Sequence, residues 1–160
     1  MLKGLLKIFL GDKSSSDLKE IQPIVDEILI AEKELLSISA DELRAKTSLL
    51  RSRITDFVSE LQNEIDTLLE QAASMPESNL DAKEAVFERV DKLEAEINEQ
   101  LEVVLAEILP EAFAIIKETA KRFSAEEDIE VTALDFDKDI AASRDMVSIR
   151  GDKAYWSKHW

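Results

Sequence analysis

The sequence lacks cysteine and has one histidine, three glycines and three prolines among its 160 residues. The absence of cysteine excludes zinc fingers, iron–sulfur clusters, disulfide scaffolds and thiol nucleophiles. His159 has no plausible catalytic partner in the sequence, so a solvated side chain is the simpler interpretation. The glycines are Gly4, Gly11 and Gly151, which cannot form a dinucleotide fingerprint or a phosphate-binding loop. The sequence therefore predicts no catalytic residue and no complete cofactor site in this chain.

The composition is 45% hydrophobic and 34% charged, which predicts a folded, helix-rich protein. The length of 160 residues is typical of one domain. The net charge of −15 argues against broad nucleic-acid binding, because phosphate contacts require clustered lysine and arginine. No apolar run reaches the about 18 residues that a membrane-spanning helix needs.

The charge balance reverses only at the amino terminus. Residues 1–13 contain three lysines and one aspartate, a formal +2, which leaves −17 on the rest of the chain. On a helical wheel, Ile8 and the other apolar residues form one arc with the lysines outside it, which predicts a basic amphipathic helix ending at Gly11. Lys7 interrupts the apolar region and disfavours a secretory signal. The apolar arc either docks on the rest of the fold or binds a membrane surface or partner. The candidate binding residues are Leu2, Lys3, Leu5, Leu6, Lys7 and Phe9.

Two capping patterns predict where the next helices begin. The polar run 14–17 predicts a link and cap before a helix that reaches about Leu36, with Pro23 in its first turn or at a kink. Ser39 and Glu42 form a capping box, which predicts a further helix from about Ala40.

Two apolar stripes then repeat every 3.6 residues on either side of a turn at Met75–Pro76. Matching stripes separated by a short turn predict an antiparallel helical hairpin over about 41–108, with nearly straight arms roughly 45 Å long. The stripes are Leu50, Ile54, Phe57, Leu61, Ile65 and Leu68, and then Val86, Val90, Leu93, Ile97, Leu101, Val104 and Ile108. The rest of the hairpin is rich in Asp and Glu, and without Glu-x-x-His pairs a solvated face is favoured over a metal site.

The end of the sequence changes character. Pro110 is expected to end the long helix and start another that reaches about Phe123. Alternation over 129–136, and less cleanly over 146–149, predicts two or three short strands with a turn at Gly151. The aromatic residues Tyr155, Trp156 and Trp160 are typical of a core for a part that follows, with a ligand-stacking platform as the alternative. The predicted fold is mainly α with a small carboxyl-terminal β element, α+β overall.

Three stretches together resemble the amino-terminal region of the SecA family, the ATPases that drive preproteins through the bacterial translocation channel. They are Leu2–Phe9, Asp41–Thr47 and Leu109–Arg122, and the last two match the lead-in to the family's first nucleotide-binding domain in sequence and order. Residues 56–107 and 124–160 depart from the usual family pattern. They resemble insertions in the longer SecA proteins of Bacteroidetes-type bacteria.

The resemblance implies an amino-terminal part of a cytoplasmic ATPase, peripheral on the inner face of the bacterial cell membrane. Its helix at 1–13 would contact anionic lipid and the SecYEG channel, two copies would associate, and the preprotein would bind domains outside this chain. ATP and Mg²⁺ are implied for the full-length family only, because its glutamine motif and phosphate-binding loop would follow Trp160. Residues 14–123 would then form the helical region, and 124–160 an incomplete start of the nucleotide-binding domain.

A function of another class stays open. The acidic hairpin is also typical of a stand-alone protein-interaction module, with the first helix packed on its body. An enzymatic function of this chain alone is the least favoured interpretation.

Overall fold

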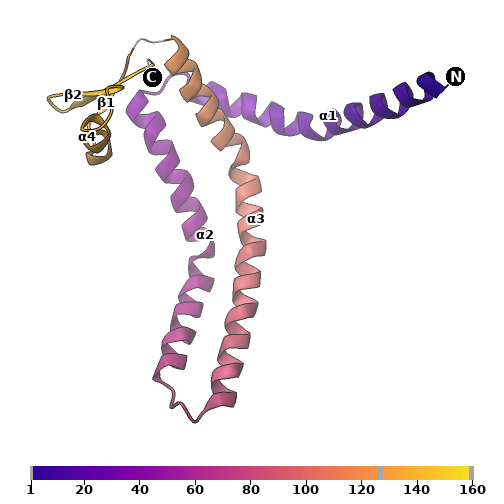
Figure 1. Cartoon of the computed structure of the whole chain (residues 1–160), viewed down its shortest axis with the longest axis vertical. Helices are drawn as coiled ribbons and strands as arrows, with labels where there is room; N and C mark the ends of the chain where they lie inside the picture. The colour runs from indigo at the N-terminus through magenta and orange to yellow at the C-terminus, as the bar shows by residue number, and fades with distance from the viewer. Residues whose placement is uncertain (1, 126–127, 159–160) are drawn as a thin grey trace. The chain divides into compact units, whose positions relative to one another are not determined.

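The computed structural model describes residues 2–125 and 128–158, with side chains from Asp17 onward. Helices make up 76% of the chain, which confirms a mainly α fold with a small β element (Figure 1). The chain divides into two compact units. One unit consists of Met1–Ala45 and Pro110–Trp160, and the other of Lys46–Leu109. The elements are α1 (Leu2–Leu35), α2 (Ala40–Ser74), α3 (Leu80–Ala125), β1 (Asp128–Thr132), α4 (Asp135–Ala141), β2 (Val147–Arg150) and β3 (Lys153–Ser157).

The predicted capping box at the start of α2 is confirmed. The amide of Glu42 donates to Ser39 Oγ at 3.2 Å, and the Glu42 carboxylate accepts from the Ser39 amide at 2.7 Å and its hydroxyl at 2.8 Å. These bonds hold the pKa of Glu42 below its usual value. Two amides that the first turn would leave without partners are therefore satisfied.

The predicted end of the first helix at Gly11 is wrong, and so is the predicted link and cap at 14–17. α1 runs without a break from Leu2 to Leu35 and includes Pro23. Glycine costs about 1 kcal/mol relative to alanine inside a helix, and serine less. Such local costs do not end a helix by themselves, so composition alone misplaced this boundary.

The hairpin prediction is confirmed within the unit Lys46–Leu109, here called the arm. α2 ends at Ser74 and α3 begins at Leu80, and in Figure 1 their arm segments run side by side in opposite directions. The buried seam contains residues from both predicted stripes, which join the two helices through apolar contact. Its buried members are Ile65, Val90 and Leu93, flanked by Leu61, Leu68 and Ile97.

The predicted helix break at Pro110 is also wrong, because α3 continues through this residue to Ala125. A proline inside a helix removes one hydrogen bond and costs about 3 kcal/mol. Buried side chains lie on both sides of it, Ile108 before and Ala114 and Ile115 after. Their burial offsets the local cost, since a fully buried aliphatic side chain contributes about 1.5–3 kcal/mol.

A three-stranded antiparallel sheet of order β1-β3-β2 follows α3. Gly151 has a φ of +63° in the turn between β2 and β3, so the predicted turn is confirmed. The first predicted strand extended too far: β1 ends at Thr132, and the residues from Asp135 belong to α4. One side of the sheet carries the buried side chains Ile129, Val131, Val147 and Ala154.

Prediction: Ser39→Ala lowers the free energy of unfolding by about 1 kcal/mol, because the α2 amide loses its hydroxyl partner. Urea titration followed by tryptophan fluorescence measures the change. Ser52→Ala, at an exposed position inside α2, is the matched control. An equal effect of the two substitutions would show that the cap does not contribute.

Candidate functional site

The predicted binding residues have side chains that lie outside the described part of the structure. They are Leu2, Lys3, Leu5, Leu6, Lys7 and Phe9. His159 and Trp160 lie entirely outside the described residues. The backbone of α1 is helical from Leu2, which agrees with the predicted helix at this end. The described part of α1 also exposes large apolar side chains, so its apolar character extends beyond residue 13. They are Leu18, Ile21, Ile24, Val25, Leu29 and Ile30.

Arg122 of α3 fixes the carboxyl end of α1. Its Nη2 donates to the carbonyl oxygens of Leu35 and Ile38, both at 2.9 Å, and its Nε donates to Glu118 at 2.9 Å. The bond from Arg122 outweighs burial and holds the pKa of Glu118 below its usual value. A cation at a helix carboxyl end also interacts favourably with the helix dipole. This cluster therefore terminates α1 and attaches it to α3.

Asp137 of α4 is the most enclosed charged residue described, with 0% of its surface exposed. Arg44 of α2 donates to its two carboxylate oxygens from Nη1 at 2.9 Å and Nη2 at 2.5 Å. The Leu134 amide donates at 2.8 Å and Trp156 Nε1 at 2.9 Å. Four donors thus compensate one buried carboxylate, which meets the condition for a stable buried charge.

A second contact attaches the first turn of α2 to the end of β1. The Asp41 carboxylate accepts from the Thr132 amide and the Thr132 hydroxyl, both at 2.8 Å. Arg44 Nη1 also donates to the Thr132 carbonyl at 3.3 Å. The segment 41–44 therefore holds α4 and β1 together, and this is the structural reason for the motif residues Asp41 and Arg44.

Burial raises the pKa of Asp137, but the hydrogen bonds from Arg44, Leu134 and Trp156 outweigh it and leave the pKa below its usual value. Burial likewise raises the pKa of Asp41, and the bonds from Thr132 reverse the shift. Both groups are thus carboxylates at neutral pH. They bind other parts of the chain and act as structural groups rather than proton donors.

The sequence interpretation missed Asp137, and it named Trp156 without recognising it as a partner of Asp137. The signal was present: Asp137 stands three residues after Leu134, a spacing at which an acidic side chain caps a helix. Trp156 was expected to form a core with a part that follows in the sequence. It instead stacks on Phe136, with ring centroids 6.2 Å apart, and packs against the sheet core.

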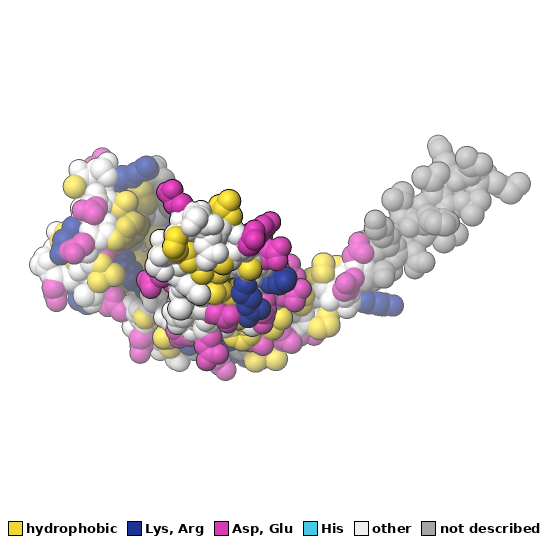
Figure 2. Space-filling model, turned by 90° about the horizontal axis from the view of Figure 1, so that it is seen from below, with side chains coloured by type: hydrophobic (Ala, Val, Ile, Leu, Met, Phe, Trp, Pro, Cys, Tyr) yellow, Lys and Arg dark blue, Asp and Glu magenta, His cyan; other side chains and the backbone are white. Residues whose placement is uncertain are grey.

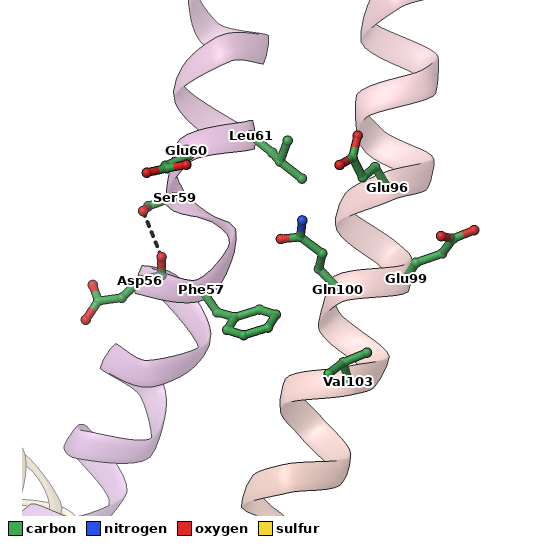
Figure 3. Close-up of a pocket in the computed structure, with 9 residues that line it drawn as sticks. All are labelled: Asp56, Phe57, Ser59, Glu60, Leu61, Glu96, Glu99, Gln100 and Val103. Carbon is green, nitrogen blue, oxygen red and sulfur yellow. Dashed lines mark hydrogen bonds between the residues drawn. The ribbon is translucent and has the colours of Figure 1, made fainter.

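A groove of about 840 Å³ lies between α2 and α3 within the arm. Figure 3 shows Phe57 and Leu61 directed toward α3, with Gln100 opposite them. Phe57 was expected in the hairpin seam, yet 44% of its surface is exposed, and Val103 is 52% exposed. Four carboxylates complete the lining together with Ser59, and none of the nine lining residues is basic. The carboxylates are Asp56, Glu60, Glu96 and Glu99.

The arm carries most of the excess negative charge. Residues 46–109 contain six lysines and arginines against 15 aspartates and glutamates. Figure 2 shows acidic side chains spread over the visible surface, with hydrophobic side chains exposed between them. Among the described residues no group of three or more His, Asp or Glu side chains could hold a metal ion.

Most of the chain matches a domain family that is already known. Residues 6–136 match the SecA DEAD-like domain. The chain belongs to the SecA family and corresponds to its amino-terminal region.

Three curated relatives are each described as a protein translocase subunit SecA. The protein of Porphyromonas gingivalis is 49% identical over 154 residues, which cover 96% of this chain. The protein of Bacteroides fragilis is 46% identical over 155 residues, which cover 97% of this chain. The protein of Flavobacterium psychrophilum is 42% identical over 161 residues, which cover 99% of this chain. The chain spans 14% of the length of each relative. No solved structure matches it.

None of the described helices combines the length and apolar character needed to cross a membrane. The three glycines of the chain do not lie together in one loop. A phosphate loop requires several backbone amides in a glycine-rich turn, whereas Gly4 and Gly11 lie inside α1 and Gly151 in a hairpin turn.

Prediction: Asp137→Asn lowers the free energy of unfolding by about 3 kcal/mol, because Arg44 loses its charged partner in a buried site. Urea titration followed by tryptophan fluorescence reports the change, since Trp156 contacts residue 137 directly. Asp139→Asn, exposed on the same helix, removes an equal charge and is expected to change stability by less than about 0.5 kcal/mol. A loss no larger than this control's would refute the role of the buried pair.

Prediction: stability is lost in acid through the same carboxylate. Folding lowers the pKa of Asp137, so the unfolded chain binds more protons than the folded chain. The contribution of Asp137 to the free energy of unfolding is therefore complete above an ordinary aspartate pKa of about 3.9. It decreases as the pH falls through the folded-state pKa of Asp137. The unfolding midpoint measured from pH 7 to pH 2.5 should fall less steeply in acid for Asp137→Asn than for the unsubstituted chain. Asp139→Asn should retain the full slope, and parallel curves for all three would contradict the assignment.

Proposed function

We propose that this chain is the docking and scaffolding region of a SecA-type translocase motor. In this proposal its amino-terminal helix contacts the anionic inner face of the cell membrane and the SecYEG channel. The remaining helices and the sheet form a platform for the ATP-driven domains that move preproteins. ATP and Mg²⁺ belong to those domains, and contact between two copies is a further part of the proposal.

The observation that carries the proposal is the charge reversal within one continuous helix. The segment 1–13 has a formal +2 while the remaining residues have −17. Burial of its apolar residues favours a membrane interface, and each lysine near an anionic surface adds about 1 kcal/mol. The acidic remainder is repelled by the same surface. Binding is therefore expected to be weak, reversible and sensitive to salt.

The scaffolding part rests on ion pairs and hydrogen bonds within the unit that contains both chain ends. Arg44 joins α2 to α4, and Arg122 joins α3 to the end of α1. Lys117 also pairs with Glu32 of α1 at 2.6 Å. These contacts give α1 a fixed attachment at its carboxyl end, as a docking helix requires.

Prediction: the full chain sediments with vesicles containing anionic phospholipid, and Lys3→Glu combined with Lys7→Glu reduces the bound fraction at least about tenfold. Each reversal replaces an attraction of about 1 kcal/mol by a repulsion. Lys19→Glu combined with Lys33→Glu makes the same charge change at exposed positions on α1 outside the segment. This control is expected to retain most of the binding.

Two results would reject membrane docking. One is equal binding to anionic and neutral vesicles, which would remove the electrostatic basis. The other is an equal loss in both double variants, which would show that only the total charge of the chain matters.

A further inference from the structure

The arm groove is a surface that the docking proposal leaves unused. Its apolar lining consists of Phe57 and Leu61 from α2 and Val103 from α3. Phe57 and Val103 are about half exposed, although the buried seam around Leu93 joins the same two helices further along the arm. In Figure 3 Gln100 stands opposite Phe57, so a polar side chain occupies the place from which α3 would otherwise cover the ring. The groove is therefore an apolar surface that the arm itself leaves open.

Carboxylates border this apolar strip on both sides. Asp56 and Glu60 are four residues apart on α2. Glu96 and Glu99 are three residues apart on α3. In Figure 3 Asp56 and Glu60 lie on the outer side of α2 and Glu99 on the outer side of α3, with the apolar side chains between them. Each helix thus presents two carboxylates about one helical turn apart along the strip.

The groove carboxylates have no positive partner within the described part of the chain. In the arm Arg89 pairs with Glu64 at 2.8 Å, whereas none of the four carboxylates that line the groove forms an ion pair with a described residue. Like charges one turn apart on a helix repel each other. An occupant with positive charge on both sides would therefore relieve repulsion within each helix while it covers the apolar strip.

This lining restricts the occupant to one kind of structure. Anionic lipid and nucleic acid would be repelled by the carboxylates. A helix that is apolar all round would place apolar side chains against carboxylates on both sides. A helix with one narrow apolar stripe and basic residues along both edges of that stripe matches the groove, as charged residues flank the apolar seam of a coiled coil. Docking of an amphipathic helix into an apolar groove is an established mode of recognition.

The chain's own basic segment does not have this pattern. On a helical wheel of residues 2–9, Lys3 and Lys7 lie together outside the apolar arc rather than along its two edges. A helix with this arrangement cannot bring positive charge to both sides of the groove while its apolar arc fills the strip. The pattern that fits is therefore expected on a different protein.

We propose that the arm groove binds an amphipathic helix of a partner protein, whose narrow apolar stripe has Lys or Arg along both edges. The stripe covers Phe57, Leu61 and Val103, and its flanking cations face the four carboxylates. The docked helix and the two arm helices then form a short three-helix bundle. This inference does not rest on membrane docking, because the groove lies within Lys46–Leu109 and the docking residues lie outside that unit.

Prediction: the full chain binds a dye-labelled synthetic peptide of about three heptads, with Leu at positions a and d and Lys at positions e and g. The lysines at e and g oppose association of the peptide with itself. Fluorescence anisotropy measures the Kd, which should rise with salt. A second peptide of the same composition, with its lysines gathered at one end, should bind at least about fivefold more weakly because it cannot place charge along both edges.

Charge reversal separates the groove from the general acidity of the arm. Glu60→Lys with Glu96→Lys should raise the Kd at least about tenfold, since attraction becomes repulsion on both sides. Glu84→Lys with Glu88→Lys makes the same charge change at exposed positions outside the groove and should leave the Kd within about twofold. An equal loss of affinity in both double variants would overturn the proposal.

The apolar strip is tested in the same way. Phe57→Ala should raise the Kd at least about fivefold, because it removes the largest apolar side chain of the groove. Phe87→Ala truncates a ring of similar exposure on α3, 49% against 44%, outside the groove. This control should leave the Kd within about twofold, and an equal loss in both would overturn the role of the strip. Far-UV circular dichroism checks that each variant retains its helices.

Disulfide formation locates the peptide without any change of charge in the lining, since the chain has no cysteine of its own. A peptide with a central Cys in its apolar stripe should form a disulfide with a Gln100→Cys chain. The yield should be at least about fivefold greater than with a Glu84→Cys chain, which carries its cysteine at an exposed position of α3 outside the groove.

Three further results would overturn the proposal. Equal binding of the two peptides would show that only their total charge matters. A disulfide yield no greater at residue 100 than at residue 84 would place the peptide elsewhere on the chain. A chain with Lys3→Glu and Lys7→Glu that binds the first peptide at least about tenfold more tightly would show that the basic segment of the chain itself already occupies the groove.

Discussion

The buried ion pair between Asp137 and Arg44 is the interaction on which the sheet-containing unit depends. A carboxylate with no exposed surface is costly, and here it is compensated by a bidentate guanidinium, a backbone amide and the Trp156 indole. These donors come from α2, from the residue before α4, and from β3. One carboxylate therefore fixes three segments that are distant in sequence. Removal of either charge leaves the other without its compensation, and this makes the cluster specific as well as stabilising.

The arm is stabilised by a different principle. Its seam is a narrow line of aliphatic side chains around Leu93, and its surface carries a large excess of carboxylates. Their mutual repulsion opposes compaction, and the exposed pair between Arg89 and Glu64 compensates little of it. A long hairpin tolerates such charge because the carboxylates are spread along its length and solvated.

The sequence predicted what depends on local patterns: the hairpin from its 3.6-residue stripes, the start of α2 from Ser39 and Glu42, and the turn at Gly151. It failed where long-range contacts outweigh local preference. Burial on both sides carries α3 through Pro110, and nothing local reveals that Arg44 pairs with a residue 93 positions later. Membership of the SecA family was also predictable, because Asp41–Thr47 and Leu109–Arg122 match the family in sequence and order. The exposure of Phe57 could not be predicted, since its stripe position alone does not show that the polar Gln100 lies opposite it across the hairpin.

The segregation of charge connects these features to the docking proposal. The first 13 residues have a formal +2 and the remainder has −17. In this proposal only the first turns of α1 would be attracted to anionic lipid, while the acidic arm would be repelled by the same surface. The position of each charge would then matter more than the total charge of the chain. A charge reversal within 1–13 would remove the attraction, whereas the same reversal further along α1 would leave it in place.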